Sequence, residues 1–350
     1  MPRTTITMSG AVLLLSMTLA TPGLTQSAPS RSITQINGGV YRATNNFHGT
    51  VFLVTSEGIV LADPLTMDFA VWLKNELDMR FDVPVRYVIY SHHHWDHATG
   101  GSVFADTATF VGHANMLDHL AMPPATATLA DIVGQEAPIA ALDTNGDGIV
   151  DRNEATAGNV EDIRFTAFDA NADGRLTGAE IMRGPVSLVY PPELTYSDEL
   201  EIRLGGKRVR MEWVGKMNHS MDSSLITFPD DDVMFVVDYV TFGRLPYREM
   251  DFELGRFDEW MAKIREAEAI AANYAFVATG HGPTGTRDNI VQWREYFENL
   301  RAAVAGAIAE GQSLEEMQQS IILDEYRGWV GYDWLHENVL GMYHFLTDEH

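Results

Sequence analysis

The sequence contains no cysteine among its 350 residues. The chain therefore forms no disulfide, has no thiolate nucleophile and cannot build a zinc site from cysteine ligands. Any metal must be bound by histidine, by a carboxylate or by a carbonyl oxygen. If the protein is exported without disulfides, its stability must come from core packing and from bound metal.

Basic residues are scarce as well. The chain has 24 lysines and arginines against 49 aspartates and glutamates, which gives a formal net charge of −25. An acidic surface repels a phosphate backbone, so we expect no nucleic-acid partner and predict a small-molecule substrate instead. With 45% hydrophobic and 21% charged residues, the composition is that of a folded globular protein.

Long apolar runs are also missing. The most apolar stretch, residues 11–20, follows Arg3 and is too short to span a bilayer. Small residues then follow, with cleavage positions after Ala20 or Ala28. We therefore interpret residues 1–28 as a secretory signal, and predict an exported, periplasmic protein without stable membrane insertion once the signal is removed.

The rest of the chain predicts an α/β fold. Short β-branched runs predict strands, and residues 67–79 predict a helix because apolar residues recur every four positions. Further strands and helices are expected after residue 185, and residues 128–184 form an acidic, turn-rich insertion. The predicted strands are 39–43, 50–55, 58–63, 85–90, 201–204, 209–214, 224–228 and 233–237, and the later helices are 256–273, 287–309 and a C-terminal segment.

A histidine-rich loop directly follows the apolar strand 85–90. Its sequence, Ser91-His-His-His-Trp-Asp-His97, contains the pattern H-x-H-x-D-H. In a loop leaving a strand, His92 and His94 can reach one metal ion while Asp96 and His97 turn toward a second. Imidazole nitrogen and carboxylate oxygen suit Zn²⁺, and they also accept iron or manganese.

This motif resembles that of the metallo-β-lactamase superfamily, and four more segments match in order. They are Asp63 at the end of an early strand, His219 in His-Ser-Met-Asp, Asp238 after an apolar strand and His281 in Thr-Gly-His-Gly-Pro. The resemblance implies an αββα sandwich with two zinc ions at one edge, formed by residues 29–127 and 185–350. In that family pattern the first ion is bound by His92, His94 and His219, the second by Asp96, His97 and His281, and Asp238 bridges them.

The insertion carries two calcium-loop motifs, which most relatives lack. Each has oxygen ligands at the spacing of a twelve-residue EF-hand loop and ends in glutamate, and Val150 and Leu176 are placed to pair across the two loops. We therefore predict an EF-hand pair that binds up to two Ca²⁺. Its ligands are Asp143, Asn145, Asp147, the Ile149 carbonyl, Asp151 (directly or through water) and Glu154, then Asp169, Asn171, Asp173, the Arg175 carbonyl, Thr177 and Glu180.

The resemblance implies a hydrolase that uses a metal-bound hydroxide on an ester, lactone or related acyl bond, with Asp96 as the catalytic carboxylate that accepts a hydrogen bond from the nucleophile. Three alternatives stay open. The H-[ST]-x-D pattern at 219–222 keeps a β-lactamase in consideration. An iron-dependent oxidoreductase on the same fold is the second, and a calcium-binding scaffold with an inactive metal site is the third. His48, between two strands, is expected to flank the site, and Asp63 and Asp222 are expected to support ligands rather than bind metal.

Overall fold

The computed structural model describes residues 29–133, 136–215, 219–248 and 257–347. The predicted signal peptide lies outside these residues. Within them, no helix is long and apolar enough to cross a membrane.

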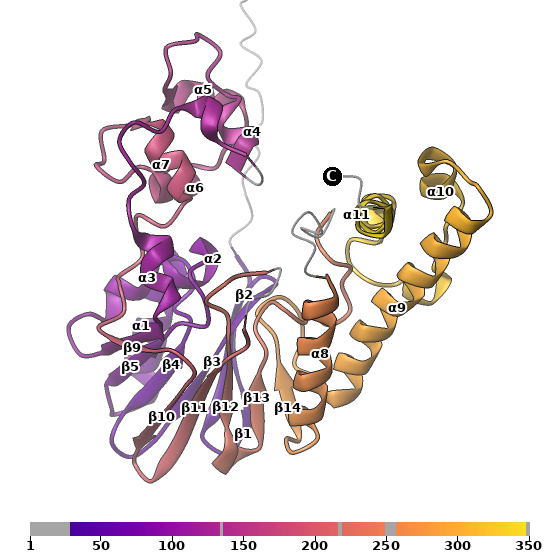
Figure 1. Ribbon diagram of the computed structural model, residues 1–350. Helices are drawn as coiled ribbons and strands as arrows, with labels where there is room; N and C mark the ends of the chain where they lie inside the picture. Colours follow the sequence, from indigo (N-terminus) through magenta and orange to yellow (C-terminus); the bar gives the residue numbers. More distant parts are fainter. Residues whose placement is uncertain (1–28, 134–135, 216–218, 249–256, 348–350) are drawn as a thin grey trace, which may run out of the picture.

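Two mixed β-sheets form the body of the molecule (Figure 1). In the first sheet the strand order is β1-β2-β3-β4-β5-β6-β9, antiparallel as far as β4 and parallel beyond it. Its strands are β1 (Arg31–Asn37), β2 (Val40–Asn45), β3 (His48–Val54), β4 (Ile59–Ala62), β5 (Val85–Ile89), β6 (Thr109–His113) and β9 (Leu194–Tyr196).

In the second sheet the strand order is β10-β11-β12-β13-β14, with only the pair β13 and β14 parallel among these neighbours. Its strands are β10 (Glu199–Leu204), β11 (Lys207–Trp213), β12 (Ser224–Phe228), β13 (Val233–Phe235) and β14 (Phe276–Ala278).

Three apolar layers hold these sheets and their flanking helices together. One lies between the sheets, and a second lies between the first sheet and α1 (Met67–Arg80). The third covers the second sheet with α8 (Phe257–Ala271), α9 (Arg287–Ala309) and α11 (Leu335–Thr347). The described chain thus has two mixed sheets with flanking helices, as the α/β prediction requires.

The helix predicted at 67–79 is confirmed as α1, because Phe69, Leu73 and Leu77 all point into the core. The predicted helix 287–309 is confirmed without change of bounds as α9. By contrast, the strand predicted to run from 233 to 237 ends at Phe235, and Val237 has a positive φ of 53°. A β-branched residue in this conformation is strained, and such strain is common where a side chain is aimed into a site.

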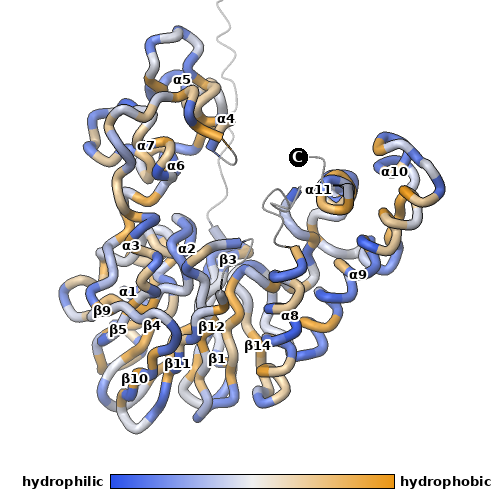
Figure 2. The backbone as a smooth tube through the Cα atoms, in the orientation of Figure 1, coloured by the Kyte–Doolittle hydropathy of each residue, from blue (hydrophilic) through white to orange (hydrophobic). Residues whose placement is uncertain are grey.

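The insertion stands apart from the sheets, above the edge at which α2 (Trp95–Ala98) and α3 (Asn115–Leu120) lie (Figure 1). It has its own apolar cluster, and the loop beside α5 is hydrophilic (Figure 2). Val150 pairs with Leu176 between its two short strands. Its elements are α4 (Ala137–Ala140), β7 (Val150–Asp151), α5 (Arg152–Ala157), α6 (Asp162–Phe168), β8 (Arg175–Leu176) and α7 (Gly178–Arg183).

The end of the chain continues from α9 through α10 (Leu314–Ser320) to α11. Short 3-10 turns complete the described structure: η1 (Gly101–Phe104), η2 (Leu129–Asp131), η4 (Pro229–Asp231), η6 (Asp324–Tyr326) and η7 (Tyr332–Trp334).

Candidate metal centre

The histidine loop begins where two parallel strands end side by side. Asp63 follows β4 and has a positive φ of 45°, and Ser91 follows the neighbouring strand β5. The backbone N–H of Ser91 donates to Asp63 Oδ1 at 2.8 Å, and its hydroxyl donates to Oδ2 at 2.6 Å. Asp63 therefore fixes the start of the loop rather than facing its open side.

His92, His94 and His219 form the first cluster of the site. The Nε2 atoms of His219 and His92 are 3.1 Å apart, and the ring centroids of His94 and His219 are 4.6 Å apart. His219 comes from the segment between β11 and β12, which places it across the sandwich edge from the histidine loop.

The second cluster contains Asp96, His97, Asp238 and His281. The Nε2 atoms of His97 and His281 are 3.3 Å apart, and Asp96 Oδ2 is 3.3 Å from His281 Nε2. Buried Nδ1 of His97 lies 3.3 Å from Asp63 Oδ2, so that Nε2 is the ring nitrogen directed toward the other members of the cluster.

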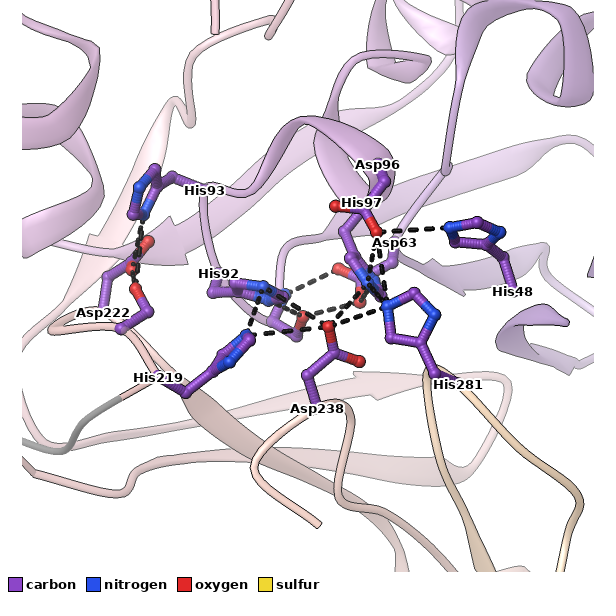
Figure 3. Close-up of polar contacts among 12 residues, drawn as sticks. His48, Asp63, His92, His93, Asp96, His97, His219, Asp222, Asp238 and His281 are labelled. Atoms are coloured by element: carbon purple, nitrogen blue, oxygen red, sulfur yellow. Dashed lines mark hydrogen bonds and ion pairs between the residues drawn. The ribbon is translucent and has the colours of Figure 1, made fainter. Parts of the chain in front are cut away.

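One carboxylate oxygen joins the two clusters (Figure 3). Asp238 Oδ2 lies 3.0 Å from the Nε2 atom of His97 and 3.1 Å from that of His281. On the other side it lies 3.6 Å from the Nε2 atom of His219 and 3.9 Å from that of His92. The turn of the backbone at Val237 is what brings this side chain into the centre.

Close packing around Asp238 requires a glycine next to His281. A Cβ at Gly280 would lie 2.1 Å from Asp238 Oδ1 and 2.8 Å from a ring carbon of His97. No side chain fits there without moving the carboxylate or the imidazole. This explains the glycine that precedes His281.

Electrostatics divide the histidines into two kinds. Burial, together with neighbouring imidazoles, holds the pKa of His92 and His94 well below the usual range, so that both rings are neutral. Burial also lowers the pKa of His281, but the carboxylates of Asp238 and Asp96 outweigh it and raise that pKa to about 9. His97 has its pKa raised against burial in the same way. Asp238 is strongly buried, yet His281 and His97 keep its pKa well below the usual range.

This donor set fits a pair of transition-metal cations. Neutral imidazoles and ionised carboxylates are the forms that bind metal, and a cation would replace the protons now shared by His97, His281 and the carboxylates. Among the described residues, Asp238 Oδ1 and His281 Nδ1 are buried without a hydrogen-bond partner. Imidazole nitrogens that face each other at about 3 Å around one carboxylate are also better satisfied by a shared cation.

The comparisons agree with this geometry. The family model described as "Metallo-beta-lactamase superfamily" matches residues 80–281. The chain belongs to this superfamily. It is a metal-dependent hydrolase whose histidine and aspartate clusters resemble a dinuclear site. No curated protein sequence matches the chain.

Solved structures share the fold at low sequence identity. A metallo-beta-lactamase from Pontibacter korlensis is 14% identical with a TM-score of 0.50, and the match covers 77% of this chain and 100% of the other. The stereoselective inverting sec-alkylsulfatase Pisa1 from Pseudomonas sp. is 14% identical with a TM-score of 0.58. That match covers 91% of this chain but only 51% of the alkylsulfatase. A double mutant of that alkylsulfatase is 15% identical with a TM-score of 0.60, and covers the same shares of the two chains.

His48 lies at the second cluster, where the sequence suggested only a flanking position. Its Nε2 atom is 3.3 Å from Asp96 Oδ2, and its ring centroid is 4.6 Å from that of His281. His93 points away from the clusters and contacts Asp222 Oδ1 at 2.9 Å, and the hydroxyl of Ser220 donates to the same oxygen. The parallel ring of His119 stacks on His93 with centroids 3.8 Å apart.

Sequence analysis missed Arg42. Its guanidinium is buried and donates to the carbonyls of Thr279 and Gly282 and to the hydroxyl of Thr284, on both sides of His281. Burial lowers the pKa of Arg42 to about 10, which still leaves it charged at neutral pH. The available signal in the sequence was a charged residue, Arg42, within a predicted strand that is otherwise largely apolar.

The side-chain oxygens predicted as calcium ligands accept hydrogen bonds from the backbone of their own loops. Within the part of the chain that the structure describes, no three carboxylates of either loop lie together as a metal-binding group. In the first, Asp143 accepts hydrogen bonds from the backbone of Gly146 and Gly148, and Glu154 accepts from Thr144 and Asp151. In the second loop, Asp169 accepts from Asp173 and Gly174, and Glu180 accepts from Ala170 and Thr177. Asn145, Asp147, Asn171 and Asp173 accept from backbone N–H groups two residues ahead, and Asp151 caps α5.

Proposed function

We propose that the protein is a dinuclear zinc hydrolase that cleaves an ester, lactone or related acyl bond. The observation that carries the proposal is the position of Asp238 Oδ2, within 3.9 Å of imidazole nitrogens from both clusters. In this proposal His92, His94 and His219 would hold one zinc, Asp96, His97 and His281 would hold the other, and Asp238 would be shared by both. Two zinc ions at such a site lower the pKa of a shared water and polarise a substrate carbonyl.

The remaining groups orient these ligands. Asp63 holds Nδ1 of His97, which leaves Nε2 for the metal, as carboxylates do for many zinc-binding histidines. His48 contacts the Asp96 oxygen that faces His281, so it would position this carboxylate to accept a hydrogen bond from the nucleophile. Arg42 holds the turn that carries His281.

β-Lactam hydrolysis is the alternative within the same chemistry. The sequence pattern that suggested it, His219-Ser-Met-Asp222, has a local use in the fold, since Ser220 and Asp222 hold His93. That use weakens the argument from the motif. The likeness to a sec-alkylsulfatase adds secondary alkyl sulfates to the substrates worth testing.

A substrate panel tests the proposal. Protein loaded with zinc, and separately with iron, is assayed against lactones, aryl esters, thioesters, β-lactams, phosphodiesters and secondary alkyl sulfates. We expect acyl hydrolysis with zinc and a metal content of about two per chain. Turnover only with iron and an electron acceptor would instead support an oxidoreductase, and turnover of nothing with two metals bound would leave a scaffold role.

We also propose that the insertion is an EF-hand pair that binds up to two Ca²⁺ for structural stability. Its support is the ligand spacing of the two loops, the pairing of Val150 with Leu176 between them, and the ionised state of Glu154, whose pKa is lowered chiefly by the backbone hydrogen bond from Asp151. Extracellular sites of this kind bind calcium at roughly 10⁻⁴ to 10⁻³ M. A calcium titration followed by calorimetry tests it.

We further propose export to the periplasm, on the strength of residues 1–28 alone. Cell fractionation and N-terminal sequencing of the mature protein test this. An N-terminus at residue 21 or 29 is the expected result. An intact N-terminus in the cytoplasmic fraction would contradict it.

A further inference from the structure

A second feature lies beside the metal centre and is not explained by metal binding. Arg244 follows β13 and Asp238, and its central guanidinium carbon is 5.3 Å from the ring centroid of Phe47 and 5.1 Å from that of Trp334. Phe47 in turn stacks on His48 with centroids 4.4 Å apart, and its ring is 5.8 Å from that of His281. Arg244 is therefore one aromatic ring removed from the second cluster.

The charge of Arg244 is not used by a carboxylate of the described residues. Within residues 29–133, 136–215, 219–248 and 257–347, no acidic oxygen is recorded within 4.0 Å of its guanidinium nitrogens. By contrast, the partly buried Arg294 of α9 is paired with Glu268 and with Glu298. Half-burial lowers the pKa of Arg244, while the charges of Asp238 and Asp96 raise it. Arg244 therefore interacts electrostatically with the carboxylates of the metal centre without contacting them.

The fold holds this arginine in place. Leu245 donates its backbone N–H to Val330 and Val330 donates to Gly243, each at 2.9 Å. Buried Asn338 of α11 donates to the carbonyl of Pro246 at 3.2 Å. Val330 and Asn338 of the C-terminal part of the chain thus fix the segment that carries Arg244, and a fixed guanidinium loses little conformational entropy when it binds a partner.

Arginine stacked on aromatic rings keeps the N–H groups at its edge for hydrogen bonding. The planar fork matches a carboxylate in two parallel hydrogen bonds. The overall charge of −25 opposes large polyanions, so a small substrate with one anionic group suits the protein better.

We propose that Arg244, flanked by Phe47 and Trp334, is a specificity-determining residue that binds a carboxylate on the substrate, so that the preferred substrates are anionic esters or lactones. The proposal rests on the hydrolase function proposed above. It adds that the carboxylate lies on the side of the second cluster, with the apolar part of the substrate against the two rings.

The test compares two aryl esters that differ in one charge, p-nitrophenyl butyrate and mono-p-nitrophenyl glutarate. The zinc-loaded wild type should favour the glutarate ester in kcat/KM. In Arg244→Met, whose apolar stem still packs against the rings, that preference should fall by about 10- to 100-fold, mostly through KM. Arg244→Lys should retain part of it, and Arg203→Met, which removes an exposed arginine from β10, should retain all of it. An unchanged ratio in Arg244→Met would overturn the proposal.

A binding measurement separates this proposal from the hydrolase function. Monomethyl glutarate is titrated into the wild type and into Arg244→Met by calorimetry, after circular dichroism has established that both are folded. We expect binding to the wild type and at least tenfold weaker binding to the variant. If neither ester is hydrolysed but this difference is seen, the acyl-hydrolase function fails and the anion site stands. Equal binding, or none to the wild type, refutes the anion site.

Discussion

The metal centre and the two acidic loops of the insertion, for which we propose calcium binding, draw their polar side chains from very different lengths of chain. The centre takes its ligands from the ends of β5 and β13 and from turns near residues 219 and 281, and all of them are buried or partly buried. Each loop of the insertion takes its oxygens from one short segment, 143–154 or 169–180, and much of the first loop is exposed. The metal centre forms only if the two sheets pack correctly against each other, whereas each loop of the insertion needs little more than a local turn.

This contrast predicts which substitutions should affect function and which should affect stability. In the centre, a ligand is also a packing element, as the fit of Gly280 against Asp238 shows. In the insertion, the carboxylates are satisfied by backbone N–H groups of their own loop, and a separate apolar cluster supports them. Changes in the centre should therefore abolish function, and changes in the insertion should alter stability alone.

The largest effect is expected from Asp238→Ala. Without the carboxylate between the clusters, metal content should fall from about two per chain toward one, and kcat/KM should drop by more than about 100-fold, beyond the loss seen for outer-shell partners. Metal analysis and steady-state kinetics measure both. Asp230→Ala, which removes an exposed carboxylate paired with Arg208, serves as the matched control. Two metals and full activity in Asp238→Ala would contradict the bridging role.

Arg42→Met should have the next largest effect. It should lower both the stability of the fold and the affinity for metal. It leaves the carbonyls of Thr279 and Gly282 without their donor, at a cost of about 1–3 kcal/mol for each buried group. We expect a lower Tm together with weaker binding of one metal, because the turn carrying His281 is released. Thermal denaturation with and without zinc measures this, with Arg208→Met as a surface control. A normal Tm and normal zinc affinity would show that the turn keeps its conformation without Arg42.

Calcium should affect stability but not the metal centre. At about ten times its Kd, calcium bound only to the folded state stabilises it by about 1.4 kcal/mol for one site. We expect a higher Tm for the insertion in millimolar calcium, and no such rise in the double variant Glu154→Gln, Glu180→Gln. Zinc content should be the same in both proteins. If calcium changes the kcat/KM of the wild type without changing its Tm, the two regions are coupled and the contrast drawn above fails.

The smallest effect concerns Glu136, a partly buried carboxyl at the start of α4. Burial raises its pKa, and the charge of Arg164 only partly offsets this. Because the folded pKa is the higher one, the carboxyl contributes stability below its unfolded pKa and loses it as pH rises through the folded value. Glu136→Gln should therefore raise Tm slightly at neutral pH but not in acid. A Tm profile from acid to neutral pH, run beside Glu161→Gln, decides this; a lower Tm at neutral pH would mean that the pair with Arg164 is worth more than the burial costs.

Much of the fold followed from local patterns. The four-residue spacing in α1 and the bounds of α9 were correct because amphipathic helices reveal their buried face in the sequence. The end of β13 was wrong, because the sequence does not show that Val237 leaves the strand to turn Asp238 inward. That conformation is unfavourable by itself and is held by the surrounding structure.

The sequence by itself determined which atoms could bind metal and in what order they occur, because the H-x-H-x-D-H spacing and the two acidic loops are properties of short segments. Only the tertiary structure decided which of these atoms meet at Asp238, why Gly280 has no side chain, and that Arg42 and Arg244 support and border the centre. The physical reason is distance along the chain. Contacts between residues hundreds of positions apart depend on the register of two sheets and on the docking of the C-terminal helices, and no local pattern encodes them.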